Sequence, residues 1–184
     1  MALPSLSKAV SALKIKKNRD LLCVSAGMGA LVGGMKLTGL ALFTKGMVGL
    51  EQEWRQKRDF DGTWAERFEK SAAFYEGTHM DPTNRVLHRI GIPMILGGAA
   101  GLIVCPSYRP MWLASNALFT VGWGLNLVGH AVYEKNAPAF ADDPLSFLMG
   151  PLWDLKQARR GASPEPVRAA APAPAEPDLE PVLA

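Results

Sequence analysis

Residues 82–133 read PTNRVLHRIGIPMILGGAAGLIVCPSYRPMWLASNALFTVGWGLNLVGHAVY, two apolar runs on either side of a proline-bounded turn. Residues 90–105 carry no charge, and a helix over them is about 24 Å long at about 1.5 Å per residue. Residues 111–133 are also uncharged and, as a helix, can cross a hydrocarbon core of about 30 Å. We therefore predict an all-α fold, a small integral membrane helical bundle built on a two-helix hairpin that is kinked at Pro93.

The N-terminal residues predict a basic arm followed by an apolar membrane segment. Residues 1–20 carry five lysine or arginine side chains and one acidic side chain, and residues 21–50 are mostly apolar. Gly29 and Gly33 are four residues apart, a spacing that lets helices pack closely in lipid. Because Lys36 interrupts the apolar run, two alternatives to one spanning segment stay open: a helix lying in the interface, or two shallow half-helices that break near Lys36.

Residues 51–73 combine aromatic and charged side chains. Phe60, Trp64 and Phe68 follow one another at intervals of four residues, which places them on one helix face. We predict an amphipathic helix here, lying at the membrane interface or on the face of a bundle.

The C-terminal part divides into a membrane domain and a tail. We assign residues 74–158 to one membrane domain that carries every histidine of the chain. Residues 144–153 are apolar but too short to span a bilayer, so we predict a re-entrant or interfacial piece there. Residues 159–184 are rich in proline and alanine, which predicts a disordered tail.

Charge predicts the orientation of the protein and excludes one class of partner. The formal net charge is +3 and no basic stripe with interleaved aromatic residues is present, so we expect no nucleic-acid partner. Arg85, Arg89 and Lys135 flank the free ends of the hairpin. Basic residues favour the cytoplasmic side of a bilayer, so we predict that these ends face the cytoplasm, in a bacterial inner membrane or the endoplasmic reticulum. A homo-oligomer is compatible with this arrangement.

The chain contains only three histidines, His79, His88 and His130, and all lie near the free ends of the hairpin. Because the hairpin returns to the side from which it starts, His88 and His130 can face each other while His79 folds over them. Three imidazoles can hold one metal ion and leave coordination positions open, as in a catalytic site. From spacing alone, hydrogen-bonded histidines at a membrane interface are an equal alternative.

Asn84 and Glu134 each lie one helical turn from a histidine, Asn84 from His88 and Glu134 from His130. We predict that both orient the imidazoles and serve catalysis, with direct ligation by Glu134 as an alternative. The purely structural alternative is an interhelical contact for Asn84 and an interfacial charge pair between Glu134 and Lys135.

Residues 74–93 read FYEGTHMDPTNRVLHRIGIP, and residues 129–139 read GHAVYEKNAPA. These stretches resemble the two motifs of the 2-hydroxy fatty acid dioxygenase family of fatty acid α-oxidation, H-x-x-P-x-N-x-x-x-H-x-x-G-x-P and G-H-x-x-x-E-K/R-x-x-P-A. The resemblance covers residues 74–153, so the basic arm, the first apolar segment and the tail lie outside it.

The resemblance implies an Fe(II)-dependent dioxygenase that acts in a membrane on 2-hydroxy fatty acids and shortens them by one carbon with release of CO2. It implies that His79, His88 and His130 are the iron ligands, and that O2 is the second substrate. We expect Arg85 or Lys135 to attract the substrate carboxylate, with snorkelling of these side chains to the interface as the alternative.

Two other function classes stay open. A zinc-dependent membrane lipid hydrolase would use the three histidines, with Glu134 as the base. A non-enzymatic membrane scaffold protein would use the histidines as packing contacts or as a pH-sensitive element. A di-iron membrane hydroxylase is nearly excluded. Such enzymes need either several Glu-x-x-His motifs or more histidines than the three in this chain.

Overall fold

The computed structural model describes residues 16–159, and all regular structure within them is helical, which confirms the all-α prediction. Most of the predicted basic arm, residues 1–15, and the predicted tail from residue 160 lie outside the described residues. The domain boundaries proposed from the sequence stay a prediction.

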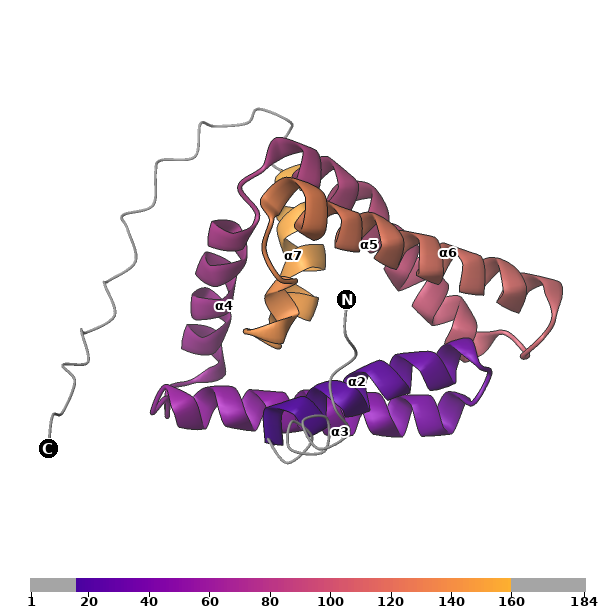
Figure 1. Cartoon of the computed structure of the whole chain (residues 1–184), viewed down its shortest axis with the longest axis horizontal. Coiled ribbons are helices and arrows are strands. Elements are labelled where there is room, and N and C mark those ends of the chain that lie inside the picture. The colour runs from indigo at the N-terminus through magenta and orange to yellow at the C-terminus, as the bar shows by residue number, and fades with distance from the viewer. Residues whose placement is uncertain (1–15, 160–184) are drawn as a thin grey trace, which may run out of the picture.

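Two antiparallel helical hairpins form the frame of the molecule (Figure 1). The first pairs α2 with α3, and the second pairs α5 with α6. A π-helical turn, η1, continues α6, and α4 and α7 lie between the hairpins at the end where they diverge (Figure 1). The bounds are α2 Lys16–Val32, α3 Lys36–Lys57, α4 Trp64–Thr78, α5 Pro82–Val104, α6 Pro110–Val128, η1 Gly129–Glu134, η2 Ala139–Ala141 (one 3-10 turn) and α7 Ser146–Arg159.

The first apolar segment is two helices. The chain breaks at Gly34, whose φ of 82° is in the left-handed region that favours glycine, and α3 begins at Lys36. Two half-helices broken near Lys36 were one of the sequence alternatives, and the structure has this one. α2 and α3 do not meet at Gly29, because nothing outside its own helix backbone lies within 4 Å of a Cβ built there, and the packing in lipid predicted from the Gly29–Gly33 spacing stays a prediction. The helices touch at Gly46 instead, where a Cβ would lie 2.6 Å from the Asp20 carbonyl oxygen.

Residues 51–73, predicted as one amphipathic helix, are divided between α3 and α4. The chain turns at Asp59, which has a φ of 44°, and Thr63 and Glu66 then form a capping box that starts α4. Phe60 therefore lies between the helices, packed edge-on against Trp54 with ring centroids 5.5 Å apart. Strong local start and stop signals outweigh the four-residue spacing here.

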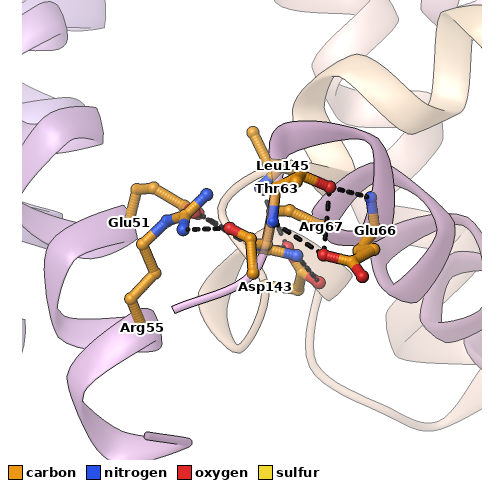
Figure 2. A network of polar contacts seen from close by, with 8 residues as sticks. Glu51, Arg55, Thr63, Glu66, Arg67, Asp143 and Leu145 are labelled. Carbon is orange, nitrogen blue, oxygen red and sulfur yellow. Dashed lines mark hydrogen bonds and ion pairs between the residues drawn. The ribbon is translucent and has the colours of Figure 1, made fainter. Parts of the chain in front are cut away.

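A buried ionic network joins α3, α4 and the segment before α7 (Figure 2). The Arg67 guanidinium, which is fully buried, donates to Glu51 at 2.9 Å and to Asp143 at 2.7 Å, and lies 3.4 Å from the ring centroid of Trp54. Burial acts to lower the pKa of Arg67, but hydrogen bonding to Asp143 and Glu51 outweighs burial and raises this pKa above its ordinary value. Both partners are needed, because a buried charge is tolerated only when it is paired.

The two hairpins are linked at their tips. The Tyr108 hydroxyl donates to the Gly33 carbonyl at 2.7 Å, and the Asn116 amide donates to the Val32 carbonyl at 2.9 Å. The Lys36 ammonium also donates to the Cys105 carbonyl. These bonds satisfy carbonyl groups that the end of a helix leaves without intrahelical partners.

Among the described helices, only α5 is both long and apolar enough to cross a membrane. Only 28% of its most apolar window is buried, unlike the core helix of a soluble protein. Large apolar side chains also lie exposed along both hairpin helices, among them Ile90, Leu96, Met111, Leu118, Val121 and Leu127. The span predicted over residues 111–133 stays a prediction, since polar side chains such as Asn116 and Asn126 reduce the apolar character of α6.

Candidate metal centre

The three histidines meet at one point of the bundle. His79 ends α4, His88 lies in the second turn of α5, and His130 lies in η1. Their ring centroids are 4.7, 4.8 and 4.9 Å apart, and each side chain is at most 5% exposed. One ring nitrogen of each lies within 4.8 Å of the others, so the group can hold a metal ion.

Local signals in the sequence position His88. The Asp81 side chain accepts hydrogen bonds from the Thr83 and Asn84 amides, and Pro82 occupies the first turn, so α5 begins where the sequence predicts. The α5–α6 pair then approaches closely across glycines. The Asn84 side chain lies against Gly129, and a Cβ at that position would collide with its amide oxygen.

The π-helical turn η1 positions His130. Such turns widen the helix by one residue and occur frequently at functional sites. The turn ends at Lys135, whose φ of 56° is left-handed, and the Asn136 backbone amide donates to the His130 carbonyl at 3.2 Å. This geometry returns the chain so that Asn136 lies beside the imidazole six residues before it.

Each imidazole is held through Nδ1. The partner is the Tyr75 carbonyl for His79 at 2.8 Å, the Asn84 carbonyl for His88 at 3.0 Å, and Asn136 Oδ1 for His130 at 2.7 Å.

Carbonyl and amide oxygens only accept, so Nδ1 of each ring carries the proton and Nε2 keeps its lone pair. The Asn136 amide has a defined orientation, because its Nδ2 donates to the Thr78 carbonyl at 3.0 Å. Metal-binding histidines have this arrangement, in which an oxygen atom fixes the tautomer and the opposite nitrogen binds the ion.

Burial of the ring and the charges around it keep His79 neutral. Burial lowers the pKa of His79 to about 3, and the neighbouring His88, His130 and Arg85 lower it as well, against the opposing hydrogen bond to Tyr75. The ring also stacks on Tyr75, with centroids 3.8 Å apart. A neutral imidazole is the form that binds metal ions.

The side chains of Glu134 and Asn84 lie near the histidines but form their hydrogen bonds with other groups. Glu134 Oε1 accepts from the Asp81 amide at 2.7 Å and from Asn84 Nδ2 at 3.2 Å, which ties η1 to the start of α5. Glu134 is outside the group of possible ligands, and Asn84 holds His88 through its main-chain carbonyl. The catalytic roles predicted for both side chains stay a prediction.

Arg85 and Lys135, predicted to attract a carboxylate, do not line the cavity at the histidines. Arg85 Nε donates to the His79 carbonyl at 2.6 Å, and its guanidinium lies 5.4 Å from the Trp153 ring centroid. Lys135 is exposed. Arg85 therefore helps to fix the histidine that ends α4.

A mainly apolar cavity of about 90 Å³ adjoins the three rings. An aromatic cluster of Trp123, Phe140 and Phe147 borders it, with ring centroids 4.9 to 5.8 Å apart. The cavity is also bordered by the apolar side chains of Ile92, Leu96 and Leu127 and by the polar side chains of Asn126 and Ser146.

The sequence analysis missed Tyr75 and Asn136 as partners of the imidazoles. In an α-helical continuation Asn136 would lie away from His130, and only the π-helical turn brings them together. The only signal for this contact in the sequence was that a polar residue, Asn136, follows Glu134 and Lys135.

A family model described as 2-hydroxy-palmitic acid dioxygenase Mpo1-like matches residues 65–161. The chain belongs to this family. The match confirms the resemblance noted from the two motifs and includes all three histidines of this Mpo1-like chain, together with Tyr75 and Asn136. The hairpin of α2 and α3 lies before the matched residues. No curated protein and no solved structure gives a significant match to the chain.

Proposed function

We propose that this protein is an Fe(II)-dependent dioxygenase of 2-hydroxy fatty acids that shortens them by one carbon. The observation that carries the proposal is the convergence of three buried imidazoles, each with an oxygen partner at Nδ1, on an apolar cavity. The description of the family supports the class of substrate.

The reaction balances without another cofactor. The bond between C1 and C2 breaks, and RCH(OH)COOH with O2 gives RCOOH, CO2 and H2O. The acid loses four electrons and O2 gains four, so no external reductant is required. Iron(II) on three neutral imidazoles would supply open coordination positions for the substrate oxygens and O2.

The residues of the chain supply orientation and a dry environment. Tyr75, Asn84 and Asn136 hold the three rings in one tautomer, which points Nε2 of each ring away from its partner. Apolar side chains around the cavity keep water away from the reacting carbon.

The cavity is smaller than the roughly 150 Å³ that hold a benzene ring, so it receives the head group and the first carbons of a fatty acid. Leu96 and Leu127 border the cavity and are also 50% and 48% exposed, on the apolar outer face of α5 and α6. We infer that the rest of the acyl chain passes between them into the bilayer. This agrees with a membrane protein that has its site near the cytoplasmic side.

The zinc-hydrolase alternative receives no support from Glu134, its candidate base, because that carboxylate accepts hydrogen bonds from Asp81 and Asn84. A scaffold role does not account for three buried imidazoles that converge within reach of one metal ion.

One preparation tests the proposal. The full chain is purified in detergent without oxygen and loaded with Fe(II), and O2 uptake is measured with 2-hydroxypalmitate. We expect one iron per chain, and one CO2 and one pentadecanoate for each O2 consumed. A preparation that binds zinc and cleaves esters, or that binds no metal, would contradict the proposal. Asn116→Ala is the matched control. The Asn116 amide of α6 donates to the Val32 carbonyl and does not border the cavity.

A further inference from the structure

The cavity is bordered by polar side chains that have no role in the reaction as proposed above. We propose that Asn126 and Ser146 bind the head group of the substrate, a hydroxyl next to a carboxylate. The inference rests on the proposed function for the identity of the substrate, and on the geometry of the cavity for the two residues.

Both side chains are more than nine-tenths buried and border the cavity, with exposed fractions of 9% for Asn126 and 6% for Ser146. Within residues 16–159, neither Asn126 Oδ1 nor Ser146 Oγ has a hydrogen-bond partner. Buried polar atoms are nearly always paired, so an orphan at a cavity wall indicates a bound molecule that completes it.

Asn126 lies on the same face of α6 as His130, one helical turn before it, which is about 6 Å along the axis. Ser146 comes from the start of α7, where its backbone amide donates to the Asp143 carbonyl at 3.0 Å. Asp143 is in turn fixed by Arg67 (Figure 2). The two polar groups therefore approach the histidines from different elements, and the second is held by the ionic network.

The chemistry of this pair matches a 2-hydroxy acid. No lysine or arginine borders the cavity in the described part of the chain, so neutral groups are left to recognise the head group beside the metal ion that the three histidines would hold. A serine hydroxyl can donate to a carboxylate, and the amide oxygen of an asparagine can accept from a hydroxyl. A fatty acid without the hydroxyl leaves Asn126 unpaired, and sites built for a hydroxyl reject such analogues.

A packing role for Asn126 predicts something different. Its amide oxygen lies against Gly91 of α5, and a mere contact between helices would affect stability without affecting the choice of ligand. Ligand preference therefore separates the two roles.

The test measures binding of 2-hydroxypalmitate and of palmitate to the full chain in detergent, without oxygen. We expect the wild type to prefer the hydroxy acid, and Asn126→Ala to weaken its binding about tenfold while palmitate binding is unchanged. Ser146→Ala, which removes one atom and is safe for folding, weakens binding of both acids because both carry the carboxylate. All variants keep their affinity for Fe(II), since the three histidines are intact.

Two controls have matching chemistry outside the cavity. Asn116→Ala removes an amide from the same helix, and Ser71→Ala removes a buried hydroxyl that also has no partner in the described chain. Neither should change ligand preference. Wild-type affinity and preference in folded Ser146→Ala and Asn126→Ala would overturn the inference.

The outcome is separable from that of the proposed function. Selective binding that the two variants lose, in a protein that consumes no O2, supports the head-group site and refutes the dioxygenase. Full turnover with unchanged binding in both variants supports the dioxygenase and refutes the head-group site.

Discussion

Both hairpins use glycine to bring their helices close together, but only the second places asparagine amides against its glycines. In the α2–α3 hairpin, glycines such as Gly46 bring backbone against backbone, and a side chain there would meet main-chain atoms of Asp20 and Val24. In the α5–α6 hairpin, Gly91 and Gly129 instead face the amides of Asn126 and Asn84. Gly98 and Gly122 also bring backbone against backbone in the α5–α6 hairpin, so the asparagine amides beside the histidines are what distinguishes it.

This difference agrees with the extent of the family match, which covers α4 to α7 and not the first hairpin. We infer that the second hairpin carries the chemistry and that the first supports it. Substitutions in the second should therefore affect metal binding and turnover, and substitutions in the first should affect stability.

The largest effect is expected for His130→Ala. It removes one of three imidazoles, and the chain has no fourth histidine to replace it. We predict loss of stoichiometric iron and of O2 uptake, with a melting temperature near that of the wild type, measured by metal analysis, an oxygen electrode and thermal unfolding in detergent. Wild-type oxygen uptake in this variant would refute its role as a ligand.

Asn136→Ala should weaken metal binding about 10- to 100-fold, because loss of a group that orients a metal-binding imidazole has effects of this size. Asn136 accepts from His130 Nδ1 at 2.7 Å. A chelator competition measures the affinity, with Asn116→Ala as control. If affinity is unchanged, the tautomer of His130 does not depend on this amide.

Gly46→Ala tests the first hairpin. Its Cβ would lie 2.6 Å from the Asp20 carbonyl oxygen, and overpacking of this kind costs about 1–3 kcal/mol. We predict a lower melting temperature and an unchanged metal affinity of the folded protein. Gly29→Ala is the matched control, since that position is open and alanine favours a helix. Loss of metal at unchanged stability would reverse the division of roles.

The smallest effect is expected for Tyr108→Phe, which removes the hydroxyl that links the hairpin tips. Tyr108 is 70% exposed, so we predict less than about 1 kcal/mol of destabilisation, with the ring still packed on Trp112. Thermal unfolding measures it. A large fall in activity would mean that the two hairpins are coupled through their tips.

Local signals account for most of what the sequence predicted correctly. Asp81 and Pro82 define the start of α5, and the proline-bounded turn defines the hairpin, so the meeting of His88 and His130 follows from helix geometry. The two motifs added the family, which the family model confirms.

What the sequence analysis missed depends on unusual backbone or on packing. Lys135 adopts a positive φ although it is not glycine, so its residue type does not predict the end of η1. The contacts of Gly46 and the partners of Asn136 depend on which helices approach each other. That Ser146 borders the cavity, as the proposed head-group site requires, becomes visible only once the helices are packed.

The most direct test of the central claim is X-ray absorption at the iron edge of the Fe(II)-loaded full chain. We predict scattering from about three imidazole rings in the wild type, in line with the ligand numbers of open catalytic sites, and no such signal in His130→Ala, which loses stoichiometric iron. A spectrum with oxygen ligands only, or one that is identical in wild type and His130→Ala, would contradict it.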